Sequence, residues 1–414
     1  MKRLLLLAGA IVVVTMLLLL AGRACFAPSL KHEEDATWAY GLGRLRDLPK
    51  RYPSHEASTN AVDVTRLAID LEVDLAQEAG GAPRPPRANP VRKLRPAIRT
   101  YLANAVHAPG DAGDGPPGEV AAFLAEHDAP LAALRAQLNA NAPPRWTSDV
   151  QELFDPPRPN LGGVSDLAAL LAADALDRHH RGNDAAAWQD LDAIWKLGRG
   201  LLAEPDPFSA MSGISAGQTV TGIAAKLSPP VPLWWRTFAA FDFERPMAAG
   251  FQYQVWRNLL FTKRYPAGEP DNDGAFGEAL RRGAEVVVGP FRVEHAERYA
   301  ATTRERVARF ARTPPCASAG DLYAFPDVLW MRVRRYDIER EGVSRLLILK
   351  EARLATNQWP PSWPGIERSL CAGRTWSYTR AADGSMRLAL TPHLPPRSTR
   401  DTRVLLPLEF HEPR

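Results

Sequence analysis

The chain has 414 residues, which is enough for a sizeable core and for more than one domain. Hydrophobic residues make up 45% and charged residues 24%, and the net charge of +4 is too small to indicate nucleic-acid binding. Three cysteines without a CxxC pair exclude a zinc ribbon and a thioredoxin-like motif, whereas 37 prolines predict frequent breaks between helices.

An uninterrupted apolar run occupies residues 4–22, directly after Lys2 and Arg3. Its length is close to the ~20 residues that cross a bilayer as a helix, and the two cations in front of it are expected to stay cytoplasmic. We therefore predict a single-pass protein of the bacterial inner membrane. Residues 1–27 would form the cytoplasmic tip and signal anchor, and the rest of the chain would lie in the periplasm.

Two alternatives remain open for this N-terminal segment. Small residues at the required offsets allow cleavage after Ala24 or Ala27, which would release the chain into the periplasm. Lipidation of Cys25 is less well supported, because Arg23 and Gly22 stand where a lipobox would have a small residue and a leucine.

Helical periodicity dominates residues 28–372, which we predict to form an exported, irregular multi-helix body. The clearest stretch, Gly163 to Glu204, predicts two helices separated by Arg181-Gly182-Asn183. Ser58 opens another helix, whose apolar stripe continues to Leu75. The remaining helical patterns are weak over 31–50 and clearer over 97–106, 119–139 with a break at Pro130, 208–227, 233–241, 245–265, from 274 to 311, 328–338 and 344–356.

In residues 373–414 the helical periodicity ends, and apolar and polar residues alternate with a period of two. Trp376 and Tyr378 alternate with polar residues, Asp383-Gly384 predicts a turn, and the alternation resumes at Met386. Residues 404–410 could add a third strand. The predicted fold is therefore mainly α, with a small C-terminal antiparallel β-hairpin or three-stranded element docked on the body, since an isolated hairpin is marginally stable.

One part of the central stretch resembles a known repeat. Gly182-Asn183-Asp184, followed by Ala186, Ala193 and Pro205, is similar to the second helix of a tetratricopeptide repeat. The likeness covers a single hairpin and has no second copy at a fixed period. The overall plan also resembles uncharacterised exported, membrane-anchored helical bacterial proteins, a likeness that implies no activity.

Ser215 provides the sharpest enzymatic hypothesis, because Gly213-Ile214-Ser215-Ala216-Gly217 matches the G-x-S-x-G nucleophile elbow. That motif needs a preceding strand, a nearby histidine and backbone donors for an oxyanion. No hydrophobic strand precedes it here. The pattern is better explained by a narrow face of small residues that lets a second helix approach closely.

Other polar groups are better explained as structural. His179-His180, with Asp177 and Asp184, could suggest a metal site, but adjacent helical residues point about 100° apart. Glu294, His295 and Glu297 could suggest paired catalytic carboxylates, although their arginine-rich surroundings favour a salt-bridged outer face. The run Arg332–Arg335, with Trp330 and Tyr336, is more typical of core contacts than of a nucleic-acid surface. We predict no cofactor and no metal.

Cys316 and Cys371 lie outside the predicted span in every topology considered. In an oxidising compartment we expect them to form a disulfide, with two buried thiols as the alternative.

The resulting functional prediction is a membrane-anchored periplasmic scaffold or interaction protein without catalytic activity. It would contact the inner membrane through residues 4–22, bind an unidentified protein partner and bind no nucleic acid. The first alternative is an exported serine hydrolase that uses Ser215. The second is a helical protein that encloses an apolar ligand among Trp234, Trp235 and Trp256.

Overall fold

The structure is a computed structural model of the full chain. It describes Val14 and residues 31–76, 90–108, 110, 114–153, 157–265, 274–316, 325–394, 406 and 408–413, with the backbone alone at 90, 274–291 and 325–328. The predicted span, 4–22, therefore lies outside the described residues except for Val14. Within the described residues, no helix combines the length and the apolar composition that crossing a bilayer requires.

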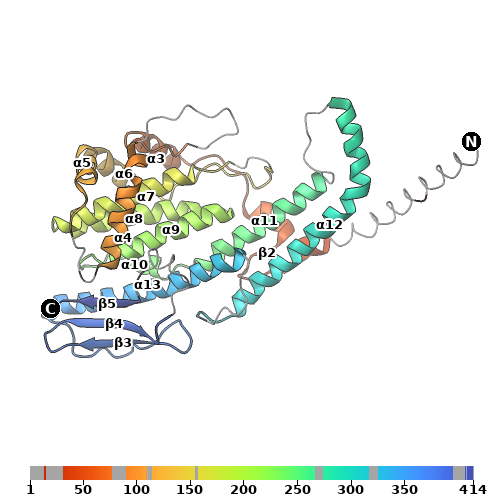
Figure 1. Ribbon diagram of the computed structural model, residues 1–414. Helices are drawn as coiled ribbons and strands as arrows, with labels where there is room; N and C mark the ends of the chain where they lie inside the picture. The colour runs from red at the N-terminus through yellow and green to blue at the C-terminus, as the bar shows by residue number, and fades with distance from the viewer. Residues whose placement is uncertain are drawn as a thin grey trace, which may run out of the picture.

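The described chain is mainly helical, with a small antiparallel sheet near the C-terminus (Figure 1). Its helical elements are η1 (Leu45–Asp47), α2 (Leu48–Arg51), α3 (Thr59–Ile69), α4 (Pro90–His107), α5 (Gly118–Glu126), α6 (Asp128–Ala140), α7 (Leu161–His180), α8 (Asp184–Leu202), α9 (Pro207–Ala224), α10 (Trp234–Ala239), α11 (Glu244–Arg264), α12 (Gly274–Arg312) and α13 (Phe325–Thr356). Its strands are β1 (Thr37–Trp38), β2 (Gly43–Arg44), β3 (Thr375–Arg380), β4 (Met386–Thr391) and β5 (Glu409–Glu412).

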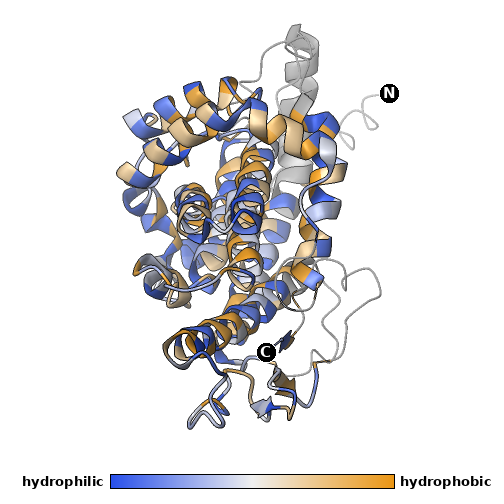
Figure 2. Cartoon of the chain, turned by 90° about the vertical axis from the view of Figure 1, so that its left-hand side faces the viewer, coloured by the Kyte–Doolittle hydropathy of each residue, from blue (hydrophilic) through white to orange (hydrophobic). Residues whose placement is uncertain are grey.

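Helices α3 to α10 form the body, and α13 runs along its base between the body and the sheet (Figure 1). Helices α11 and α12 extend from the opposite end of α13, away from the sheet. Orange and blue segments alternate along the helices in Figure 2, as expected for amphipathic helices that each bury one face. The chain thus has a compact body with one helical arm.

Helices α7, α8 and α9 pack against one another at the centre of the body. Each starts at a side chain that accepts a hydrogen bond from the first turn: Asn160 from the Gly163 amide, Asn183 from the Ala186 amide and Asp206 from the Ser209 amide. These caps explain why the predicted break at residues 181–183 separates two helices. The predicted hairpin is confirmed.

Glycines allow α8 and α9 to approach closely. A Cβ atom on Gly213 would lie 2.6 Å from Leu202 Cγ and 2.8 Å from the Gly198 carbonyl oxygen, which is too close for any side chain. The small-residue face of 208–227 therefore forms a helix–helix contact.

The helix predicted from Ser58 is shorter than its apolar stripe. Ser58 caps α3 as expected, but α3 ends at Ile69, and Glu72 has a φ of 57°. Leu71 and Leu75 are fully buried although they lie beyond the helix. The apolar stripe extends past the helix because the buried residues continue into the segment after α3. This segment turns and packs against the start of α7, where the Asp74 carbonyl faces Gly163.

Two further boundary predictions are corrected by the structure. The stretch 119–139 breaks at His127 between α5 and α6, and Pro130 lies in the first turn of α6, where its missing N–H costs nothing. The stretches 328–338 and 344–356 form one helix, α13. Gly342, which lies between the two predicted stretches, makes room for the sheet, since a Cβ there would lie 2.5 Å from Trp376 Cη2.

The weakly helical prediction for 31–50 is wrong in its middle part. Residues 31–35 are helical, but β1 and β2 form a short antiparallel hairpin, with Thr37 paired to Arg44. Gly41 and Gly43 both have a positive φ, a backbone conformation typical of tight turns.

The C-terminal sheet has the order β3-β4-β5, and all its pairs are antiparallel. The predicted turn forms, with the Gly384 amide donating to the Ala381 carbonyl. The third strand is β5, which overlaps the end of the predicted 404–410 and extends beyond it. Trp376 is fully buried against Gly342 of α13, and its Nε1 donates to Glu341 Oε2 at 3.1 Å, so the sheet is docked on the body.

Candidate functional site

Ser215 lies in the middle of α9, within a continuous helix that runs from Pro207 to Ala224. Its carbonyl accepts a hydrogen bond from Thr219 Oγ1, its side chain is exposed, and no described histidine is hydrogen-bonded to its hydroxyl. A nucleophile elbow places its serine at a strained strand-to-helix turn beside an imidazole. The geometry of an activated serine is therefore missing among the described residues.

Replacing Ser215 with alanine is expected to change the free energy of unfolding by less than ~0.5 kcal/mol, as for most exposed surface positions. Gly213→Ala, two residues away, is expected to cost ~1–3 kcal/mol by overpacking the contact with α8. Urea unfolding of both variants measures these two changes in the free energy of unfolding. Hydrolysis of an acyl ester by the parent chain that Ser215→Ala abolishes would reinstate the hydrolase.

The two adjacent histidines of α7 have separate partners. His179 Nδ1 is hydrogen-bonded to the Asp184 carboxylate, whereas His180 Nε2 faces the Asp114 carbonyl at 2.9 Å. Although burial favours the neutral acid, hydrogen bonds from His179 and Ser228 lower the pKa of Asp184. The Asp184 carboxylate thus lies between His179 and Ser228. In general-base catalysis the histidine would have to lie between the carboxylate and the serine.

Some of the charged groups of α12 form ion pairs, along the helix and with the segment before β1. Glu294 pairs with Arg298 one turn later, while Arg304 contacts both oxygens of Glu33 at 3.2 Å. Glu294 is engaged in this surface ion pair, and His295 is exposed. Among the described residues, no group of three or more His, Cys, Asp and Glu side chains has an arrangement that could hold a metal ion.

Arg332, the first residue of the basic run near the start of α13, is exposed, whereas Arg334 and Arg335 make contacts within the protein. Arg334 Nε donates to Glu244 Oε1 at 2.9 Å, and Arg335 Nε donates to Glu339 Oε1 at 3.1 Å. Trp330 is stacked on Phe310, with ring centroids 5.1 Å apart. Arg334, Arg335 and Trp330 are engaged in contacts within the protein and do not form a surface on which nucleic-acid bases could stack.

The tryptophans proposed to enclose an apolar ligand pack against protein groups. Trp235 stands 4.9 Å from Phe238 and 6.0 Å from Trp188, measured between ring centroids, and Trp234 is 6.1 Å from Trp235. Trp256 is separate from this cluster in its contacts and donates to the Val150 carbonyl. None of the three tryptophans lines the cavity next to Lys226 and His411 or the cavity near Glu204 and Tyr253.

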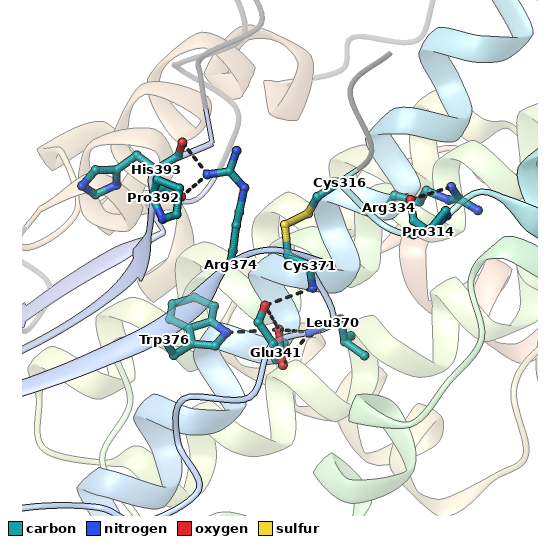
Figure 3. Close-up of a disulfide and its surroundings, with 11 residues drawn as sticks. Pro314, Cys316, Arg334, Glu341, Leu370, Cys371, Arg374, Trp376, Pro392 and His393 are labelled. Atoms are coloured by element: carbon teal, nitrogen blue, oxygen red, sulfur yellow. Dashed lines mark hydrogen bonds between the residues drawn. A yellow bond between two sulfur atoms is a disulfide. The ribbon is translucent and has the colours of Figure 1, made fainter. Parts of the chain in front are cut away.

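Cys316 and Cys371 are joined in a disulfide, with their Cα atoms 5.2 Å apart (Figure 3). This separation is within the usual range for a disulfide. The bond connects the segment after α12 to the turn before β3. Beside it, Glu341 of α13 accepts from the Leu370 amide and from Trp376 Nε1, so the same turn is also held to α13.

A cluster of charges that sequence reasoning missed lies inside the body, between α6, α7 and α8. Arg135 Nη1 donates to Asp174 at 2.9 Å and to Asp190 at 2.6 Å, and Arg178 Nε donates to Asp174 at 2.8 Å. Asp190 is fully buried. Loss of hydration and the nearby charge of Asp174 raise the pKa of Asp190 to about 8, against the attraction of Arg135 and Arg178.

Two buried lysines, also missed, hold the ends of helices. Lys226 donates to the carbonyls of Ala108 and Gly110, just after α4, and Lys350 donates to the Ala225 carbonyl at 2.9 Å, just after α9. Ammonium groups at helix C-termini complement the helix dipole. Glu412 of β5 lies 3.5 Å from Lys350, which ties the last strand to this junction.

The cavities among the described residues include two that border groups named above. One, of about 260 Å³, lies between the ends of α4 and α9 and strand β5, next to Lys226 and His411. The other, of about 20 Å³, lies near Glu204 and Tyr253 and has room for a single water molecule. No candidate nucleophile predicted from the sequence lines either cavity.

The fold and these contacts define a mainly helical protein whose buried charges join helices to one another and whose last strands are docked on α13. Comparison with protein-family models, with characterised proteins and with solved structures found no match.

Proposed function

We propose that this chain is an exported protein of the bacterial inner membrane whose periplasmic body acts as a scaffold for a protein partner. The bond between Cys316 and Cys371 carries the proposal of export, because disulfides form and persist in oxidising compartments. Residues 4–22 supply the tether, with Lys2 and Arg3 on the cytoplasmic side. Release into the periplasm by cleavage remains the alternative.

The non-catalytic role is supported by how the polar residues of the body are used. The buried arginines, lysines and acids described above pair with one another or with helix ends, so they stabilise the arrangement of helices. Ser215 lies within α9 and no described histidine is hydrogen-bonded to its hydroxyl, while His179 is hydrogen-bonded to Asp184. Such a rigid body suits presentation of a surface better than turnover of a substrate.

One engineered cysteine tests both export and partnership. Leu233 is 79% exposed, and Leu233→Cys in a Cys25→Ala background of the full chain offers one thiol for a membrane-impermeant maleimide, while Cys316 and Cys371 remain bonded. We expect labelling in cells with a permeabilised outer envelope and an intact inner membrane, and retention of the chain in washed membranes. Labelling only after lysis would contradict export, and recovery in the soluble periplasm would favour cleavage.

The scaffold is tested by coupling a benzophenone to the same thiol and irradiating intact cells. A discrete adduct at Leu233→Cys that is missing with Thr100→Cys, an exposed position on α4, is the expected result. Identical background at both positions would contradict a partner that binds this surface.

A further inference from the structure

The continuous described chain from residue 31 onward starts against the helical arm. Residues 31–35 lie against α11 and α12, because Glu33 contacts Arg304 and Glu34 pairs with Lys263 near the end of α11. In Figure 1 the upper part of α12 lies away from the sheet, whereas its C-terminal end approaches the start of α13 and the sheet, where Cys316 is bonded to Cys371. The N-terminal segment therefore joins the body at α11 and α12.

The short connection keeps this arm near the bilayer. From Gly22, the end of the predicted span, to Lys31 there are nine residue steps, which reach at most ~30 Å when fully extended. Helix α12 alone has 39 residues and a contour length of ~58 Å. The part of α12 that contacts Glu33, at Arg304, is thus held within reach of the headgroups, and Arg306, Arg309 and Arg312 follow within ~12 Å along the same helix.

Cations without acidic partners flank this point of attachment. Among the described residues, no ion pair is formed by Arg264 at the end of α11 or by Arg292, Arg306, Arg309 and Arg312 on α12. Only Arg306 among these five is partly buried. Glu297 and Glu305 are also unpaired on α12, so the arginines exceed the free acids by three, which favours an anionic surface.

We propose that these five arginines bind the anionic phospholipid headgroups of the membrane that holds the tether, so that the arm lies along the bilayer surface. The inference rests on the proposed tether. A basic residue close to an anionic bilayer contributes about a fivefold preference for the bound state, and three of them together about 100-fold. The preference is screened by salt.

The test uses the full chain in vesicles of phosphatidylcholine alone and in vesicles with one quarter phosphatidylglycerol. A fluorophore on Thr302→Cys, an exposed position of α12, in a Cys25→Ala background reports energy transfer to an acceptor attached to lipid headgroups. We expect more transfer with phosphatidylglycerol, a loss of that difference at high salt, and about a 100-fold smaller bound-to-free ratio in the variant Arg306→Gln/Arg309→Gln/Arg312→Gln.

Two matched controls separate this inference from the tether itself. The fluorophore on Thr100→Cys of α4, and the substitutions Lys93→Gln and Arg99→Gln on the same helix, are expected to leave the lipid dependence at Thr302 unchanged. A chain that fails to float with either vesicle would contradict the tether. A chain that floats with both, but shows equal transfer from Thr302 in the two lipids, would overturn headgroup binding alone.

Discussion

Replacing Arg135 with methionine is expected to lower the free energy of unfolding by ~3–5 kcal/mol at pH 9, the usual cost of removing one partner from a buried ion pair. The guanidinium donates to both Asp174 and Asp190, and all three side chains are nine-tenths or more buried. Arg178 stays near both acids, but its Nε is 3.4 Å from Asp190 Oδ2, which accepts no hydrogen bond from a described residue. Methionine fills similar space without the charge.

The loss of stability caused by Arg135→Met should be smaller at pH 6 than at pH 9. Because burial raises the pKa of Asp190 from 3.8 to about 8, folding takes up a proton between these values. The stability linked to that proton is fully present below pH ~4 and is lost as the pH rises through about 8. Without Arg135 the pKa of Asp190 rises further, so the penalty grows by up to ~1.4 kcal/mol per pH unit between the native pKa and the higher pKa of the variant.

Urea unfolding at pH 6 and pH 9 measures both effects. Asp190→Asn in the Arg135→Met background is expected to remove most of the difference between the two pH values, because the titrating group is gone. Arg99→Met, at an exposed position of α4, serves as the control and should change stability by less than ~0.5 kcal/mol at either pH. An equal loss for Arg135→Met at pH 6 and pH 9 would contradict titration of Asp190.

Most helices could be predicted because their signals are local. Asn160, Asn183 and Asp206 stand where helix caps are needed, and the apolar periodicity between them is unbroken. The prediction failed where tertiary contacts decide the conformation. Burial of Leu75 continues beyond the end of α3, and Gly342 is tolerated inside α13 because the Trp376 ring occupies the space of its missing side chain.

The charged groups of the interior could not be predicted from the sequence. Arg135 and Asp190 are 55 positions apart, and Lys226 reaches a carbonyl 116 positions away, so no local spacing brings them together. In the sequence each resembles an ordinary solvated residue on a polar helix face. Only the three-dimensional packing of α6 on α8, and of α4 beside α9, makes them partners.

Opening the bond between Cys316 and Cys371 is expected to lower the free energy of unfolding by ~4 kcal/mol in the chain-entropy model, because the two residues are 55 positions apart. The Cys316→Ala/Cys371→Ala variant and the reduced parent chain should lose the same amount in urea unfolding. Alanine is preferred because Cys371 is only 1% exposed, and a serine hydroxyl there would need a new hydrogen bond.

This loss of stability should arise from the greater conformational entropy of the denatured chain. The folded state should change little, since the turn before β3 keeps other contacts when the bond is open. Glu341 still accepts from the Leu370 amide and from Trp376, and the Trp376 ring still packs on Gly342 (Figure 3). We therefore expect near-native circular dichroism for the double alanine variant in the absence of urea. An unchanged urea midpoint in the reduced parent chain would contradict a stabilising role for the bond, and alkylation of Cys316 and Cys371 without reductant would contradict the bond itself.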